Sequence, residues 1–257
     1  EQYQQSTHGK LHAQKDPNAP VCADCHGTHA ALGKDNTQSA TFPTNVPALC
    51  GSCHREKGKA AMRYKGTEHG IPENYLESIH GKGLLKSGLV VTAMCTSCHT
   101  AHEELPAADP ASSVNPNNIA VTCGKCHKGV YEKYIRSVHA PGKAKTSEKL
   151  PVCNDCHSAH TIKRTDMNTF KFDIMNICGK CHVKIAQTYF DTFHGKVTNL
   201  GYTKTAKCHD CHGSHEILPV TDPHSSLSRE NIITTCKKCH PTATRKFAGY
   251  LTHATHH

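Results

Sequence analysis

The stretch VCADCHGTHA, residues 21–30, places two cysteines and two histidines within eight positions. Its centre, CADCH, is a C-x-x-C pair followed directly by a histidine. This unit occurs eight times, and all 16 cysteines of the 257-residue chain belong to it. The eight motifs are CADCH (22–26), CGSCH (50–54), CTSCH (95–99), CGKCH (123–127), CNDCH (153–157), CGKCH (178–182), CHDCH (208–212) and CKKCH (236–240).

C-x-x-C-H is the attachment signature of c-type haem. Its two thiols add across the vinyl groups of the porphyrin, and the next residue is placed to bind the iron as proximal ligand. Zinc ribbons also pair C-x-x-C units, but their chemistry requires no histidine after every pair. A thioredoxin-like motif would occur once beside a βαβ pattern, and a disulfide framework would not keep one spacing eight times. The sequence therefore predicts eight covalently bound haems with their iron.

The predicted attachment residues and proximal ligands follow directly from the motifs. The attachment residues are Cys22, Cys25, Cys50, Cys53, Cys95, Cys98, Cys123, Cys126, Cys153, Cys156, Cys178, Cys181, Cys208, Cys211, Cys236 and Cys239. The proximal ligands are His26, His54, His99, His127, His157, His182, His212 and His240.

Eight of the other 15 histidines recur at fixed offsets. Four lie three residues beyond a proximal ligand, in C-x-x-C-H-x-x-H: His29, His102, His160 and His215. Such a residue should not reach the far face of its own haem, so we expect it to bind the iron of an adjacent one. Four more end a Y-x-x-[ST]-x-H pattern 14 or 15 residues before the next motif: His8, His80, His139 and His194.

These offsets divide the chain into four repeats, each with two haems and two spare histidines. The match in number predicts that every iron has two histidine ligands, although the offsets do not show which distal histidine serves which haem. Segments 102–123 and 215–236, from repeats 2 and 4, align without gaps. This predicts two four-haem halves, 1–128 and 129–257.

The remaining histidines have weaker signals. His69 ends a fifth copy, YKGTEH, which lies 26 residues before the next motif and could replace His80. The tail histidines His253, His256 and His257 could be exposed to solvent or could meet a haem of a neighbouring molecule. We expect His12, His209 and His224 to lie at the surface or to contact propionates.

The motifs make the chain similar to the multihaem c-type cytochromes, here with eight haems, from residue 22 to residue 240. It also resembles the extracellular filament-forming cytochromes, whose subunits stack haems end to end. The resemblance implies haem attachment outside the cytoplasm, and hence a periplasmic or extracellular protein. Because residue 1 is Glu, we expect a mature chain from which a signal peptide has been removed.

Composition indicates how such a chain would fold. Apolar residues make up 36% of it, so we expect mostly coil and short α-helices around a stacked haem chain, with little or no β-structure. Single helices are predicted over EKYIRSVH (132–139) and QTYFDTFH (187–194), and loops over 103–120 and 141–150. No run of 18 apolar residues is present, so no membrane span is expected.

The net charge of +9, together with about +1 from each of eight ferric haem cores, would nearly balance the roughly 16 propionate charges, so the basic character does not call for a nucleic-acid partner. Two histidine ligands leave no open iron position, so we expect electron transfer and not catalysis. Candidate ligands near both ends favour a filament built from copies of the chain, which would exchange electrons with redox proteins or extracellular acceptors. The alternatives are a soluble periplasmic shuttle and a reductase acting on nitrite, hydroxylamine or tetrathionate.

Overall fold

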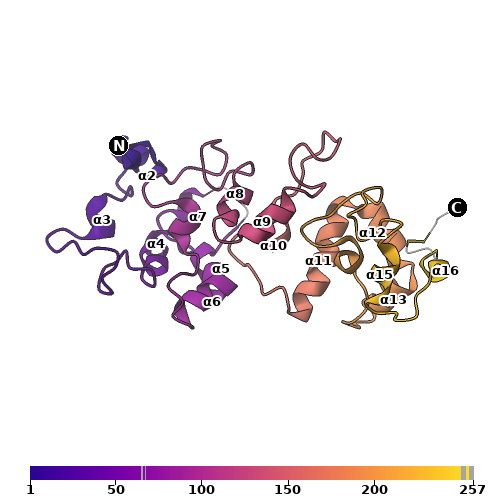
Figure 1. Cartoon of the computed structure of the whole chain (residues 1–257). Helices are drawn as coiled ribbons and strands as arrows, with labels where there is room; N and C mark the ends of the chain where they lie inside the picture. Colours follow the sequence, from indigo (N-terminus) through magenta and orange to yellow (C-terminus); the bar gives the residue numbers. More distant parts are fainter. Residues whose placement is uncertain (65, 67, 250–252, 255–257) are drawn as a thin grey trace. The chain divides into compact units, whose positions relative to one another are not determined.

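The computed structural model describes residues 1–64, 66, 68–249 and 253–254, which form two compact units. The first unit comprises residues 1–123 with 157–163, and the second comprises 124–156 with 164–257. Figure 1 shows short helices joined by long irregular connections. The division into two four-haem halves, 1–128 and 129–257, stays a prediction.

Most of the helices are one or two turns long. Those that begin in the first unit are α1 (Gln2–Gln5), α2 (Thr7–Ala13), α3 (Cys22–His26), α4 (Val46–His54), the 3₁₀ turn η1 (Ala61–Arg63), α5 (Ile71–Glu77), α6 (Ile79–Leu85), α7 (Cys95–His99) and α8 (Ile119–Gly124). Those that begin in the second unit are α9 (Lys128–Tyr134), α10 (Cys153–His157), α11 (Asn168–Cys181), α12 (Val183–Phe190), α13 (Phe193–Asn199), α14 (Cys208–His212), α15 (Ile232–Lys237) and α16 (Arg245–Ala248).

Helices account for 44% of the structure, and the described residues contain no strand. The expectation of little or no β-structure is therefore confirmed, whereas the wrapping of the chain around haems stays a prediction. The predicted loops are irregular throughout, apart from Ile119 and Ala120 at the start of α8. Among the described residues, no helix is both long enough and apolar enough to cross a membrane.

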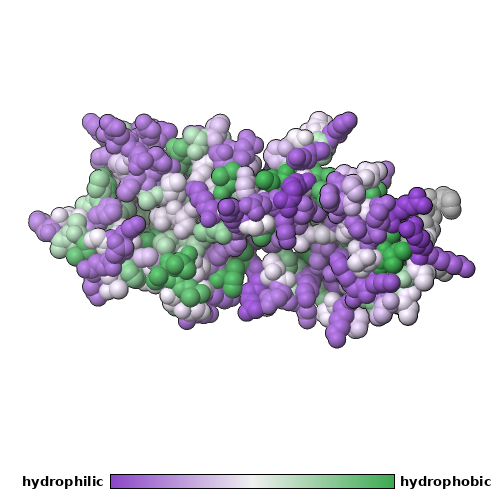
Figure 2. All heavy atoms as spheres, viewed as in Figure 1, coloured by the Kyte–Doolittle hydropathy of each residue, from purple (hydrophilic) through white to green (hydrophobic). Residues whose placement is uncertain are grey.

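The apolar core of the chain is thin. The buried apolar residues are Val46, Tyr75, Leu84, Ile119, Ala120, Ala140, Met175, Tyr189 and Ala243. Among the described residues, twenty large apolar side chains are exposed instead, and Figure 2 shows such residues (green) among the hydrophilic ones (purple). Side-chain burial alone therefore supplies little of the driving force for folding.

A recurring polar loop replaces apolar packing between the two motifs of repeats 1, 2 and 4. An asparagine at its end donates from Nδ2 to two loop carbonyls, and a serine inside it donates to the carbonyl of a leucine near its start. The asparagines are Asn45, Asn118 and Asn231, the serines are Ser39, Ser112 and Ser225, and the leucines are Leu32, Leu105 and Leu218. These side chains satisfy backbone carbonyls that no helix pairs.

The predictions of single helices over 132–139 and 187–194 are wrong. Helix α9 ends at Tyr134, before His139, and α12 ends at Phe190, so that α13 begins at Phe193 just before His194. The break occurs because Thr192 is extended, with ψ 168°, and its hydroxyl accepts a hydrogen bond from Gly195 N. A short polar side chain in this conformation starts a new helix, and local propensity did not reveal that.

The tyrosine of each Y-x-x-[ST]-x-H pattern ties its helix to the following C-x-x-C-H motif. In all four repeats the tyrosine hydroxyl donates to the carbonyl that lies two residues before the first cysteine of that motif. The four bonds are Tyr3 to Pro20, Tyr75 to Ala93, Tyr134 to Pro151 and Tyr189 to Ala206. Burial raises the pKa of Tyr75 to about 12, so its hydroxyl stays protonated and able to donate.

We expect Tyr75→Phe to destabilise the folded protein by about 1 kcal/mol, because it removes one buried hydrogen bond to Ala93. Guanidinium unfolding of the haem-loaded protein, followed by far-ultraviolet circular dichroism, would measure the change. Tyr64→Phe is the matched control, since Tyr64 begins the out-of-register copy and is 47% exposed. Equal unfolding midpoints for the two variants would contradict this role of the tyrosine.

Candidate metal centres

The first C-x-x-C-H motif of every repeat forms its own five-residue helix: α3, α7, α10 or α14. In a helix, residues three apart share a face, so both thiols lie on one side. The residue before the second cysteine stabilises this short helix by accepting a hydrogen bond from the N–H of the residue before the first. The accepting residues are Asp24, Ser97, Asp155 and Asp210.

The serine or threonine of the Y-x-x-[ST]-x-H pattern positions the distal histidine. Ser6, Ser78 and Thr192 each accept a hydrogen bond from the glycine that follows the histidine, at 3.0–3.2 Å. A Cβ on Gly81 would lie 2.1 Å from the carbonyl oxygen of Tyr75, so that glycine cannot be replaced without moving the backbone. The functional pattern is thus longer than the one quoted above, although repeat 3 carries Ala140 in place of glycine.

Six histidines that follow C-x-x-C pairs lie opposite a second histidine. The pairs and their ring-centroid distances are His54 with His8 (6.1 Å), His26 with His102 (6.0 Å), His99 with His160 (6.1 Å), His182 with His139 (6.1 Å), His240 with His194 (6.0 Å) and His212 with His253 (6.3 Å).

These distances fit two axial ligands on one metal ion. A metal–imidazole bond is about 2 Å long and the ring centroid lies about 1 Å beyond the nitrogen, so the centroids of two trans ligands are about 6 Å apart. Burial lowers the pKa of both rings in the pair of His8 and His54 and of both paired motif histidines His99 and His212. The neutral imidazole is the form that binds a metal, so the residues fit an iron between each pair.

Five of the six pairs follow two rules, and the pair of His212 with His253 follows neither. A histidine of the Y-x-x-[ST]-x-H pattern lies opposite the second motif of its own repeat, as His8 does opposite His54. A histidine of C-x-x-C-H-x-x-H lies opposite the first motif of the preceding repeat, as His102 does opposite His26. The expectation that such a histidine reaches an adjacent centre therefore agrees with the geometry.

The structure does not bring every candidate to a second imidazole. His29 is exposed and is hydrogen-bonded only to the neighbouring Thr28 hydroxyl, at 3.1 Å. His69 is exposed, and no ring pair involves it among the described residues. The ligand roles predicted for His80, His127, His157 and His215 stay predictions.

The other histidines take different places. His12 and His224 are exposed, as expected, and His209 lies 3.8 Å from the carboxylate of Asp210. His253 was left undecided by the sequence because no motif marks it, yet it is the residue opposite His212. His256 and His257 lie outside the described residues.

The arrangement does not suit the competing uses of these residue types. Among the described residues, no three histidine, cysteine, aspartate or glutamate side chains gather as a structural zinc site requires. No disulfide joins any of the described cysteines. Each of the six paired motifs instead offers two thiols and two opposed imidazoles, which is the set that a c-type haem uses.

Attachment cysteines of successive repeats touch. The thiol of Cys50 is hydrogen-bonded with that of Cys95, which lowers the pKa of Cys95 and raises that of Cys50. In the second unit, Cys178 and Cys208 form the equivalent contact, which lowers the pKa of Cys178 to about 7. The second attachment site of one repeat therefore lies against the first attachment site of the next.

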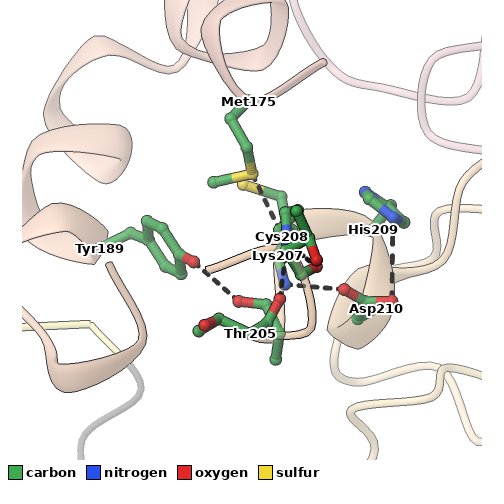
Figure 3. Close-up of polar contacts among 9 residues, drawn as sticks. Met175, Tyr189, Thr205, Lys207, Cys208, His209 and Asp210 are labelled. Carbon is green, nitrogen blue, oxygen red and sulfur yellow. Dashed lines mark hydrogen bonds and ion pairs between the residues drawn. The ribbon is translucent and has the colours of Figure 1, made fainter. Parts of the chain in front are cut away.

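Charged side chains distinguish otherwise equivalent centres. His160 Nδ1 lies 2.9 Å from Glu68 Oε1, which leaves Nε2 of this ring for the metal. The buried ammonium of Lys207 donates to the carbonyls of Thr203 and Thr205, both at 2.8 Å. Figure 3 shows Tyr189 directed at the segment that leads into Cys208, to which Lys207 itself belongs. Burial lowers the pKa of Lys207.

Neither family models, curated sequences nor solved structures provide a match to this chain. The assignment of its centres therefore rests on the motifs and on the geometry of the paired histidines.

We expect His8→Ala in the haem-loaded protein to open one iron, the one bound by His54. The ferrous variant should bind about one carbon monoxide per chain, because a vacant axial position accepts this ligand. Carbon monoxide titration monitored in the Soret band would measure this. His12→Ala, at an exposed site on the same helix, should bind none; equal binding by the two variants would overturn the pairing.

We expect Glu68→Gln to raise the reduction potential of one centre, the one bound by His99, because a carboxylate beside His160 stabilises the oxidised iron. The shift should be on the order of 30–60 mV, which is about a tenfold or smaller change in equilibrium constant. Spectroelectrochemical titration would detect it as one displaced step. Glu103→Gln, at an exposed position, is the control, and an unchanged titration of the Glu68 variant would contradict the assignment.

Proposed function

We propose that this protein is an electron-transfer protein that holds eight c-type haems between paired histidines and assembles into an extracellular filament. The observation that carries the proposal is the set of six histidine pairs with centroids 6.0–6.3 Å apart, each including a histidine that follows a C-x-x-C pair. When bound, haem iron supplies a one-electron couple.

The residues of the chain hold and tune the centres. Cysteines on short helices would hold the haem, and the two paired imidazoles would bind its iron, so a substrate would have to displace a ligand. Bis-histidine ligation favours lower potentials than histidine–methionine ligation. The carboxylate of Glu68 lowers the potential of its neighbouring centre further, whereas the buried ammonium of Lys207 beside Cys208 raises the potential there.

Contact between successive attachment sites supports a conducting role. The thiols of Cys50 and Cys95 touch, as do those of Cys178 and Cys208. Covalent attachment at touching positions keeps neighbouring haems close, as electron transfer requires. Copies of the same chain are the partners in a filament, and redox proteins or external acceptors are the partners at its ends.

The first experiment combines intact mass, spectroscopy and electron microscopy on the native protein. We expect a mass above the 28.0 kDa chain by about eight haems of roughly 0.6 kDa each. We also expect a wholly low-spin ferric spectrum, no carbon monoxide binding, and filaments that pass electrons from a chemical reductant to soluble ferric iron.

Results that differ from these expectations would favour one of the alternative functions. A shortfall in mass would overturn haem attachment, and stoichiometric carbon monoxide binding would favour a reductase. Only single particles that still carry eight low-spin haems would make the protein a periplasmic shuttle and would overturn the filament.

A further inference from the structure

Successive repeats dock through one recurring contact. The backbone N–H of Thr7 donates to Glu104 O at 2.7 Å, that of Ile79 to Ile162 O at 2.8 Å, and that of Val138 to Ile217 O at 2.8 Å. Each donor directly follows the serine of a Y-x-x-[ST]-x-H pattern, and each acceptor lies two residues beyond the last histidine of C-x-x-C-H-x-x-H in the next repeat.

The same contact delivers a ligand to the preceding repeat. Next to the first bond, His102 lies opposite His26, and next to the second, His160 lies opposite His99. Beside the third bond, Arg136 Nε donates to Glu216 Oε1 at 2.6 Å. In the first two contacts, one repeat therefore supplies a helix start, at Thr7 or Ile79, and the next supplies a carbonyl and an imidazole.

In the described structure, the donor N–H of repeat 4 and the acceptor carbonyl of repeat 1 have no counterpart in a neighbouring repeat. Repeat 4 has the donor position at Phe193, whose N–H makes no hydrogen bond within the described residues and whose side chain is 79% exposed. Repeat 1 has the acceptor segment, His29 to Ala31, in which all three residues are exposed.

The acceptor segment of repeat 1 already has the conformation of those in use. Ser39 Oγ donates to Leu32 O at 3.1 Å, just as Ser112 Oγ donates to Leu105 O at 3.0 Å in repeat 2. The loop that presents His102 to its partner is thus preformed in repeat 1 as well, although no partner lies against His29.

His253 occupies the place that this series assigns to a histidine of a next repeat. It lies opposite His212 at 6.3 Å but belongs to no motif. Within the described residues, Ala254 N donates to Thr188 O at 3.0 Å, His253 Nδ1 lies 3.3 Å from both Thr188 Oγ1 and Ile185 O, and the His253 ring centroid lies 6.5 Å from that of Tyr189.

We propose that repeat 4 of one copy binds repeat 1 of a second copy, and that His29 of the second copy replaces His253 opposite His212. The carbonyl of Ala31 then accepts the hydrogen bond from Phe193 N. The proposal rests on the function proposed above, because it requires a haem at His212. One iron–nitrogen bond breaks and another forms, and neither charge nor electrons change.

A second copy is the occupant because this chain carries both halves of the contact. At Thr7, Ile79 and Val138, the segment that follows C-x-x-C-H-x-x-H in the next repeat covers the donor. In the described structure, segment 29–31 is the one segment of this kind without a docked partner. The contact joins two different surfaces, so it is heterologous and propagates from copy to copy. His253 then acts as an internal ligand that the neighbour displaces on assembly.

The first test uses carbon monoxide binding by the haem-loaded full-length chain. We expect His253→Ala to bind about one carbon monoxide per chain when dilute and almost none once assembled, because His29 then fills the position. The double variant His29→Ala with His253→Ala should bind about one at every concentration. Binding that does not depend on concentration in the single variant, or no binding even when dilute, would overturn the exchange.

A mixing experiment assigns the donor to a second molecule. Wild-type chains, which carry His29, should suppress carbon monoxide binding by the double variant. His29→Ala chains should not suppress it, and His12→Ala chains should act like wild type. Equal suppression by all three, which would indicate a ligand from another segment, or suppression by none, would contradict the proposal.

The surface is tested separately from the ligand. We expect Phe193→Glu to raise the concentration needed for assembly by about tenfold or more, because charge enters an apolar contact. Leu200→Glu lies at the other end of α13 and is as exposed as Phe193, at 86%, so it is the matched control. Light scattering would measure assembly, and identical curves for the two variants would refute this surface.

These tests separate the two proposals. If the proposed function fails, the chains lack eight low-spin haems and the carbon monoxide experiment has no baseline. If only the exchange fails, all eight low-spin haems are present in the wild type, while carbon monoxide binding by the variants does not change on assembly or on mixing with other chains.

Discussion

The structure depends on the opposition of two imidazoles about 6 Å apart, with one supplied by a C-x-x-C-H motif and the other by a distant segment. Few apolar side chains are buried among the described residues, and paired imidazoles recur where distant segments of the chain meet. A metal between the rings would bind the folded chain far more tightly than the unfolded one, and its binding free energy would then contribute directly to folding. Polar loops, tyrosine hydroxyls and short capped helices hold the segments that carry the paired rings.

Much of the site was predictable from residue types and spacing. The eight motifs predict the attachment cysteines, and the recurring offsets predicted five of the six histidines that lie opposite a motif histidine, all except His253. The pairing was not predictable, since it depends on which repeat docks on which. Nothing in the sequence marks His253, because it lies outside the repeats and its place opposite His212 arises only from folding.

The helices were predicted less well than the ligands, for a physical reason. Apolar and aromatic residues favoured one helix over 187–194, but an extended Thr192 divides it and caps the start of the next. Hydrogen bonds such as Tyr189 to Ala206 join segments that local propensity treats as independent. The same applies to the charges beside the paired histidines. Glu68 lies within the irregular fifth copy of the tyrosine pattern, and its approach to His160 could be found only in the folded structure.

Repeats that dock on their neighbours form a series that has no natural end, and terminal repeats must be capped or joined. An internal ligand such as His253 competes at high effective concentration, because it is tethered to the chain that it serves. A neighbouring copy can displace it only if other contacts offset that advantage, and the backbone bond and apolar surface at Phe193 are of this kind. The balance between tether and surface then sets the concentration at which single chains become an assembly. In the proposed exchange, a ligand that few hydrogen bonds hold within the described residues would suit such a balance better than one built into a repeat, because it would protect the iron in isolated chains and a neighbour could still displace it.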